Sequence, residues 1–232
     1  MKKIKLPKRI KAIADLINDN KPMADIGADH ALLPCYLTLS KIIPRAIVGE
    51  LTTGPYARAC STVRGLGLET LVEVRQGDGL SILQPGEVST VVMAGMGGNT
   101  ISEILLEAGS KAETFNRLIL QPQNAHREVR TLIAQNGWPI IDERIVFDND
   151  FYSIIVVALD PIEPYFLTDI EALFGPCILR RTDEPVNREY IQFHIDKYER
   201  IKERIQSEGG KEAQQEKQYY MDLIERLEEV LR

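Results

Sequence analysis

The sequence has little cysteine, no long apolar segment, no internal repeat and no low-complexity tract. Its cysteines, Cys35, Cys60 and Cys177, lack CxxC spacing and histidines at metal-ligand distances, which argues against a zinc site and a disulfide framework. No run of 18 or more apolar residues is present, and the early lysines precede Leu-Pro-Lys-Arg instead of a hydrophobic signal core. We therefore expect no metal site, no membrane partner and a cytoplasmic location.

The chain of 232 residues is 44% apolar, which is enough for a buried core in one large domain or in one domain with an appendage. Its net charge of -6 argues against nonspecific affinity for nucleic acid, but the charge is unevenly distributed. The first eleven residues carry six basic side chains and no acidic one, whereas most of the acidic excess lies near the C-terminal end. An anionic partner can bind at the basic start.

Apolar periodicity predicts an amphipathic helix over 7–17, with a basic outer face, followed by alternating strands and helices. Short apolar runs typical of buried parallel strands lie at 23–26, 46–48, 71–74, 90–94 and 118–120. The segments 32–39, 56–63, 101–108 and 127–134 fit the helices that connect such strands. Five units of this kind indicate a doubly wound α/β sheet.

The pattern changes after the fifth strand. The runs 138–147 and 151–159 both read as strands and are separated by only three residues, which permits an antiparallel hairpin alone. Five parallel strands followed by a terminal antiparallel hairpin are typical of a Rossmann-like class I methyltransferase domain.

A Pro- and Gly-containing connection with Pro164, Gly175 and Pro176 leads to two long charged helices. We place the domain boundary near residues 160–164, which gives domains 1–162 and 163–232. Apolar residues repeat at three and four positions over 191–205 and again over 220–231, with a break at 207–210. This predicts an antiparallel coiled coil, and because its two stripes can cover each other, we expect a monomer.

In parallel sheets, ligands bind at the carboxyl ends of the strands, near the point where the strand order reverses. The first strand ends in Asp25-Ile26-Gly27-Ala28-Asp29-His30. Gly27 allows the backbone to approach a ligand, and the N–H groups that follow can bind a carboxylate. Glu50 follows the second strand, roughly 20 residues further on, where an acid can accept hydrogen bonds from both ribose hydroxyls.

Two further strand ends extend this pattern. Asp78, in Gly77-Asp78-Gly79, can accept a hydrogen bond from the exocyclic amine of an adenine. The loop Gly95-Met96-Gly97 has little side chain near its turn, so a flat substrate or a sulfonium can approach its backbone. Taken singly, these residues are also explained as turns, strand-closing acids or, for His30, a helix cap. Their common register at four strand ends favours a nucleotide-type cofactor such as S-adenosylmethionine. A nicotinamide-dependent oxidoreductase shares the first loop and Glu50, but it explains neither Asp78 nor the terminal hairpin.

Several segments together resemble the bacterial TrmK family, the tRNA adenine-22 N1-methyltransferases. They are ADIGADHALLPCYL, VRQGDGL, VVMAGMGG, LILQPQNAHREVR and FGPCIL. The resemblance covers essentially the whole chain. It implies an S-adenosylmethionine-dependent enzyme with an N-terminal Rossmann-like domain and a C-terminal coiled coil, acting on tRNA.

The resemblance also implies site residues. The expected cofactor-binding residues are Asp25, Gly27, Asp29, His30, Glu50, Asp78, Gly79, Gly95, Met96 and Gly97. Asp29 stands where the general Gly-x-Gly-x-Gly loop has a glycine, and it is our candidate catalytic residue. For phosphate contacts with tRNA we expect Lys5, Lys8, Arg9, Arg127 and Arg130.

Two alternatives remain open at the level of sequence. A small-molecule methyltransferase would be active without RNA and would show no salt-sensitive binding of tRNA. A recruitment protein would bind S-adenosylmethionine without transferring its methyl group.

Overall fold

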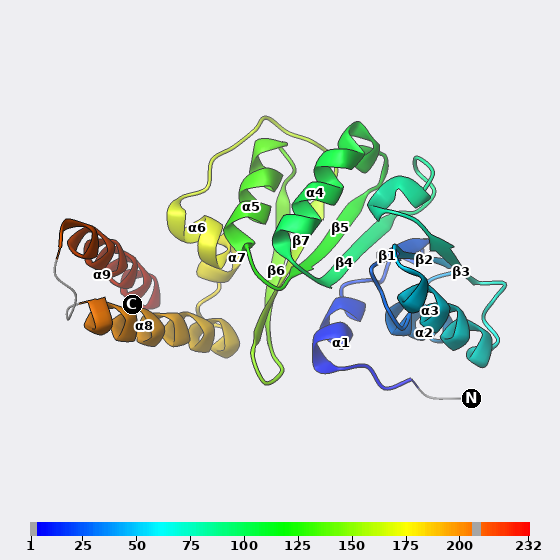
Figure 1. Cartoon of the computed structure of the whole chain (residues 1–232), viewed down its shortest axis with the longest axis horizontal. Helices are drawn as coiled ribbons and strands as arrows, with labels where there is room; N and C mark the ends of the chain where they lie inside the picture. Colours follow the sequence, from blue (N-terminus) through cyan, green and yellow to red (C-terminus); the bar gives the residue numbers. More distant parts are fainter. Residues whose placement is uncertain (1–3, 206–209) are drawn as a thin grey trace. The chain divides into compact units, whose positions relative to one another are not determined.

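Figure 1 shows the computed structural model, which describes residues 4–205 and 210–232. The chain divides after Phe166 into two compact units. Part of the predicted break at 207–210 and the lysines at positions 2 and 3 lie outside the described residues.

The first unit is built on a seven-stranded sheet in the order β3-β2-β1-β4-β5-β7-β6. Its strands are β1 Met23–Ile26, β2 Ala46–Glu50, β3 Val72–Gln76, β4 Thr90–Met96, β5 Arg117–Pro122, β6 Ile140–Phe147 and β7 Phe151–Ala158. Strands β1 to β5 are parallel, and β7 runs antiparallel to both β5 and β6. The prediction of five parallel strands and a terminal hairpin is confirmed. Because β1 lies between β2 and β4, the strand order reverses beside β1.

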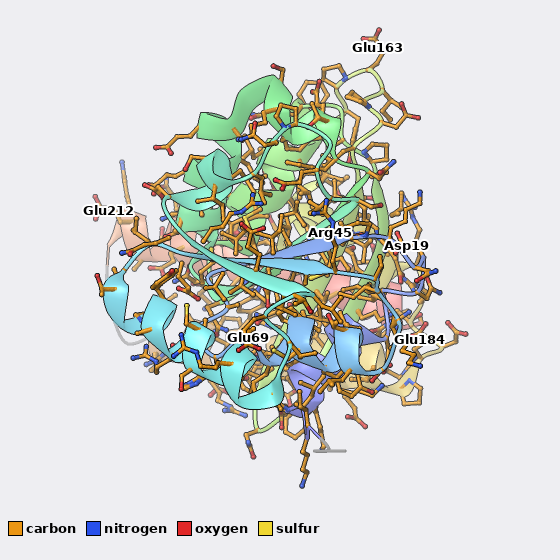
Figure 2. The ribbon with its side chains drawn as sticks, turned by 90° about the vertical axis from the view of Figure 1, so that its right-hand side faces the viewer. Asp19, Arg45, Glu69, Glu163, Glu184 and Glu212 are labelled. Atoms are coloured by element: carbon orange, nitrogen blue, oxygen red, sulfur yellow. The ribbon has the colours of Figure 1, made fainter. Side chains whose placement is uncertain are left out.

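The sheet has helices on both faces, as Figure 2 shows with α4 and α5 on one side of the strands and α2 and α3 on the other. One face carries α1 Lys8–Ala14, α2 Leu32–Leu39 and α3 Thr53–Leu66. The opposite face carries α4 Gly98–Ala108, α5 His126–Gln135 and the short 3-10 helices Gly79–Ile82 and Gly109–Thr114. Charged side chains such as Asp19, Arg45 and Glu69 lie at the outside (Figure 2).

Alternation along the strands divides the core into two clusters. In β4, Val91 and Met93 pack toward α4 and α5, whereas Val92 between them packs toward α1 to α3. Neighbouring strand residues point to opposite faces, so a parallel sheet that is covered on both sides needs apolar residues at consecutive positions. This requirement explains why the central strands appear in the sequence as continuous apolar runs.

The second unit consists of α6 Asp169–Phe174, α7 Pro176–Leu179, α8 Pro185–Ile205 and α9 Lys211–Leu231. Arg188, near the start of α8, donates a hydrogen bond of 2.6 Å to the carbonyl of Leu231 at the end of α9, so these two packed helices run antiparallel. The connection around Gly175 is partly helical, which sequence reading missed. Thr168 and Glu171 form a capping box that begins α6.

None of the described helices has both the length and the apolar content needed to cross a membrane. Within the described residues, no three His, Cys, Asp or Glu side chains gather as metal ligands would. None of the three cysteines, all within the described residues, forms a disulfide; Cys35 is buried and the other two are half-buried.

Candidate active site

A cavity of about 330 Å³ opens at the carboxyl ends of β1 and β4, beside the point where the strand order reverses. Its lining comes from three segments of the first unit: α1 with the residue before it, the end of β1 with the following loop and the start of α2, and the end of β4. The lining residues are Pro7, Arg9, Ile10, Asp25, Gly27, Ala28, Asp29, His30, Leu32, Leu33, Ala94 and Gly95. Five of the ten expected cofactor-binding residues therefore line one cavity.

The loop after β1 has a repeating backbone conformation. Gly27, Asp29 and Ala31 have φ angles of 74°, 48° and 51°, so every second residue lies in the left-handed region that favours glycine. Asp29 therefore occupies a glycine-type position, and Asp is one of the residues that tolerate it. A Cβ on Gly27 would lie 2.7 Å from Met96 Cε, the mobile end of a side chain, so the positive φ is the stronger reason for a glycine at this position.

Two buried carboxyl groups, Asp25 and Glu50, stand at the ends of neighbouring strands, and each is 6% exposed. Glu50 accepts a hydrogen bond from the backbone N–H of Asp29, which ties the end of β2 to the first loop. Burial raises the pKa of Glu50, although this hydrogen bond opposes the shift. Burial and the nearby charge of Glu50 raise the pKa of Asp25 to about 7.

The Asp29 carboxylate is held from outside the loop. Arg58 on α3 places Nε 2.7 Å and Nη2 2.6 Å from Asp29 Oδ1. His30 Nε2 lies 3.5 Å from Asp29 Oδ2, with about half of each side chain exposed. Arg58 was not among the predicted site residues, because no local pattern connects α3 to this loop.

The opposite wall of the cavity is formed where α1 meets the ends of β4 and β5. Arg9 Nη1 donates a hydrogen bond of 2.6 Å to Gln121 Oε1. Gly95 has a φ of 82°, and a Cβ there would lie 3.2 Å from Arg9 Nη1. The next turn is fixed by the Gly98 N–H, which donates to Asn124 Oδ1 at 3.0 Å. Gln121 directly follows a predicted strand, as the predicted site residues do. The rule that ligands bind at the carboxyl ends of parallel strands could therefore have identified it as a site residue.

Asp78 and Gly79 lie after β3, next to the end of β2. Gly77 N–H donates to the carbonyl of Glu50 at 2.9 Å, which places this turn beside that strand end. Asp78 is exposed, and neither residue is part of the cavity lining. The predicted strand-end residues thus form a row along one sheet edge.

The residues predicted to bind RNA differ in exposure. Lys5 and Lys8 are exposed, Arg127 is half-buried, and Arg9 lines the cavity. Arg130 is fully buried, with Nε donating to Glu143 Oε1 at 2.7 Å and Nη2 donating to Ser153 at 2.9 Å. The prediction that Arg130 contacts RNA is therefore wrong: its guanidinium connects α5 to β6 and β7 inside the domain.

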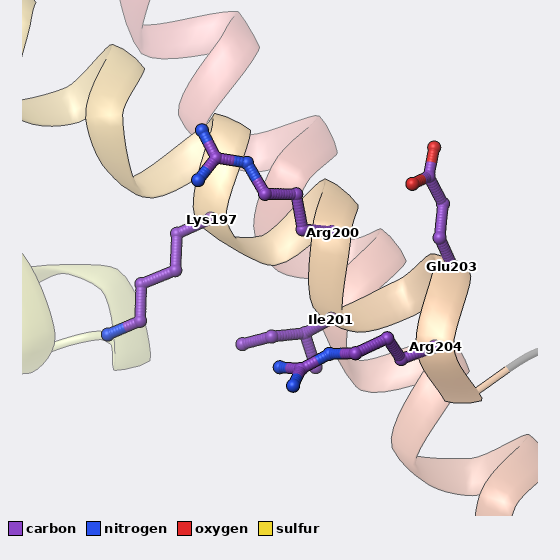
Figure 3. Close-up of a pocket in the computed structure, with 5 residues that line it drawn as sticks. All are labelled: Lys197, Arg200, Ile201, Glu203 and Arg204. Atoms are coloured by element: carbon purple, nitrogen blue, oxygen red, sulfur yellow. The ribbon is translucent and has the colours of Figure 1, made fainter.

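A second hollow lies on α8 in the other unit (Figure 3). It is lined by Lys197, Arg200, Ile201, Glu203 and Arg204. Lys197 and Arg204 extend toward the same side of the helix, whereas Glu203 projects away from them (Figure 3). We call Lys197, Arg200 and Arg204 the α8 basic patch.

The strand order, the reversal beside β1 and the acidic residues at the ends of β1 and β2 define a Rossmann-like class I methyltransferase. A more specific assignment comes from a family model described as tRNA (adenine(22)-N(1))-methyltransferase, which matches residues 23–229. The chain belongs to this family, TrmK.

Individual relatives agree with this assignment. The chain is 34% identical to the tRNA (adenine(22)-N(1))-methyltransferase of Bacillus subtilis strain 168, over 98% of this chain and 96% of that protein. An uncharacterised protein from Listeria monocytogenes serotype 4b is 35% identical, with a TM-score of 0.90 over 98% of this chain and 100% of that one. A Streptococcus pneumoniae protein in complex with S-adenosyl-L-methionine is 31% identical, with a TM-score of 0.82 over the same shares.

Proposed function

We propose that this protein transfers the methyl group of S-adenosylmethionine to N1 of adenine 22 in tRNA. Family membership gives the reaction. The observation that carries the proposal is the cavity between the loop after β1 and the end of β4, whose wall includes the basic helix α1. This arrangement offers a cofactor site and a route for an anionic substrate in one place.

The cavity residues fit S-adenosylmethionine. A volume of 330 Å³ falls within the range of small-molecule sites, about 300–1,000 Å³. Gly27 and Gly95 contribute no side chain to either side of the cavity, and Asp25 and Asp29 offer carboxylates to the amino group and the sulfonium. We assign Glu50, at the end of β2, to the ribose hydroxyls and Asp78, after β3, to the adenine amine; neither lines the cavity itself.

When bound, the cofactor supplies an electrophilic methyl group. Adenine N1 carries a lone pair that is nucleophilic at neutral pH, so the reaction needs no strong base. The contribution of the protein is to hold N1 in line with the methyl group and to exclude water. We assign Asp29 the catalytic role: its carboxylate lines the cavity, where it would stabilise positive charge developing on the adenine ring.

Two groups of basic residues are proposed to bind the tRNA phosphates. Lys5 precedes α1, Lys8 and Arg9 are its first two residues, and Arg127 lies in the first turn of α5. The α8 basic patch supplies further contacts from the second unit, and its exposed lysine and arginines support this (Figure 3). We accordingly assign residues 1–162 to methyl transfer and residues 163–232 to an antiparallel coiled coil that assists RNA binding.

We also propose that the protein acts as a monomer in the cytoplasm, where its substrate is found. The monomer is supported by the packing of α8 against α9, which buries Ile195, Leu223 and Leu227 within one chain.

The test is methyl transfer from labelled S-adenosylmethionine to unmodified bulk tRNA, followed by nucleoside analysis of the digested product. Label in 1-methyladenosine supports the proposed class, substrate and atom, and its loss when A22 of one transcript is replaced by another base supports the position. Binding of S-adenosylmethionine without label in RNA would overturn the proposal in favour of a small-molecule substrate or a recruitment role.

A further inference from the structure

Arg9 is held rigidly at the wall of the cavity. It is the second residue of α1, and Nη1 donates to Gln121 Oε1 at 2.6 Å. Its guanidinium carbon lies 5.1 Å from the centre of the Tyr152 ring on β7, within the range of a cation–π interaction. A free arginine side chain has about 2 kcal/mol of rotamer entropy to lose. These two contacts therefore place Arg9 before any ligand arrives.

Gln121 is itself fixed so that its carbonyl oxygen can accept from Arg9. The side chain is fully buried, and Nε2 donates to the carbonyl of Pro122 at 3.0 Å. Gln123 Nε2 lies 3.3 Å from Gln121 Oε1, as a second donor to that atom. Because the amide nitrogen is used by the backbone, the Gln121 oxygen is available to the guanidinium.

Gly95 leaves the space that Arg9 needs. Its φ of 82° favours glycine, and a Cβ there would lie 3.2 Å from Arg9 Nη1, closer than ordinary contact. The bare loop after β4 thus admits a guanidinium from α1 to the edge of the cavity.

Arg9 also differs in charge from the rest of the cavity. Among the lining residues that the structure describes, it alone carries a permanent positive charge, whereas Asp25 and Asp29 carry carboxyl groups. A nucleotide brings a negative phosphate into a site of this kind, and a guanidinium is well suited to bind phosphate through paired N–H donors.

We propose that Arg9 binds the phosphate of the acceptor nucleotide at the reacting centre, and that Gln121 is the positioning residue that holds Arg9 there. This inference rests on the proposed function. It separates Arg9 from Lys5 and Lys8: those lysines attract the RNA, whereas Arg9 sets the position of the adenine relative to the methyl group. Misplacing the acceptor by about 1 Å can cost about 100-fold in rate.

The test compares Arg9→Met, Arg9→Lys and Lys8→Met at saturating S-adenosylmethionine, with kcat and KM for tRNA measured separately. Both Arg9 variants should lower kcat by about 100-fold, because lysine keeps the charge but loses the paired donors. Lys8→Met should instead raise KM. Lys21→Met is the matched control, since this exposed lysine lies outside α1 and outside the cavity lining, and it should behave as wild type.

A double-mutant cycle tests the link to Gln121. Gln121→Met should lower kcat by about tenfold alone and should cause no further loss in the Arg9→Met background, because both changes disturb one unit. Additive losses would overturn the positioning role. The half-exposed Arg9 can be replaced without opening the core, so the Arg9 variants decide the inference even if Gln121→Met does not fold.

Two controls separate this inference from the proposed function. S-adenosylmethionine affinity and the unfolding temperature should stay near wild type in the Arg9 variants. A normal kcat with a raised KM would reduce Arg9 to an ordinary phosphate contact, and lost cofactor affinity would make it part of the cofactor site; either result overturns the inference. Absence of 1-methyladenosine with the wild-type protein would overturn the proposed function instead.

Discussion

Asp29 serves two requirements at one position. Its backbone must adopt the left-handed conformation of the loop after β1, and its carboxylate lines the cavity while paired with Arg58. Glycine would meet the first requirement better, so its absence at this position indicates that the side chain is needed. Asn meets the backbone requirement equally well and lacks the charge, which allows the two requirements to be tested separately.

Asp29→Asn should therefore keep the fold and lower methyl transfer by about 100-fold, as expected when a charge that stabilises the transition state is removed. Asp29→Ala should lose activity as well, and its free energy of unfolding should fall by about 1–2 kcal/mol, because alanine adopts the left-handed backbone conformation at that cost. Labelled methyl transfer and thermal unfolding measure the two effects. Full activity of Asp29→Asn would refute a catalytic role for Asp29.

The buried Asp25 predicts a stability that depends on pH. Its pKa rises from 3.8 to about 7 through burial and the charge of Glu50. The folded state therefore holds this proton more tightly than the unfolded state between about pH 4 and pH 7, and stability falls as pH rises through that window. At 1.36 kcal/mol per pH unit, the change amounts to about 4 kcal/mol.

Asp25→Asn should remove this dependence, because asparagine does not ionise. Its free energy of unfolding, from urea titrations at several pH values, should fall less steeply than that of wild type between pH 4 and pH 7. Above pH 7 the variant should be the more stable protein. If stability depended on pH in the same way for both proteins, burial would not raise the pKa of Asp25.

At the scale of elements, the sheet could be predicted because each central strand must be apolar on both faces. Met23–Ile26 was predicted to the residue, whereas β2 and β4 extend two residues further, into Glu50 and Met96 at the site. The last residues of these two strands include glycines and a glutamate, so the apolar runs in the sequence end before the strands do. Thr168 and Glu171 have the spacing of a capping box, which would have predicted the start of α6 from the sequence.

The site could be predicted only where it follows the strand ends. Asp25, Gly27 and Asp29 are close in sequence as well as in space, and the strand-end rule identifies them. Arg58 was missed because it reaches the site from a helix whose packing no local pattern reports. Arg9 was predicted as a phosphate contact, but for the same reason its place at the cavity wall was not predicted. The prediction that Arg130 contacts RNA was wrong because no local pattern reports its partner. Glu143 lies on a later strand, so from the sequence this basic helical residue looked like a surface charge.

The buried pair of Arg130 and Glu143 links α5 to β6, and both side chains are fully buried. Arg130→Met should destabilise the protein by about 3–5 kcal/mol, because it leaves a buried carboxylate without its cation. Urea unfolding measures the loss. The double variant Arg130→Met with Glu143→Leu should recover most of it, since an apolar pair removes the unpaired charge. A stable Arg130→Met with weakened tRNA binding would contradict the buried role.

At the scale of the whole molecule, an acidic protein is proposed to bind a polyanion. With a net charge of -6, long-range attraction over the entire surface is excluded, so binding has to come from local patches. The exposed lysines at the start of the chain and the α8 basic patch are such patches, one in each compact unit. If both contact one tRNA, binding by one unit raises the effective concentration of the RNA at the other.

Salt dependence distinguishes real phosphate contacts from solvated charge. Each contact contributes close to one unit to the slope of log affinity against log salt. Lys8→Glu and Arg200→Glu should therefore each lower the magnitude of that slope by about 1. Lys211→Glu, an exposed charge at the start of α9, is the matched control and should leave the slope unchanged. If Arg200→Glu also left it unchanged, the α8 basic patch would not touch RNA, and α1 with its neighbours would have to supply the whole interface.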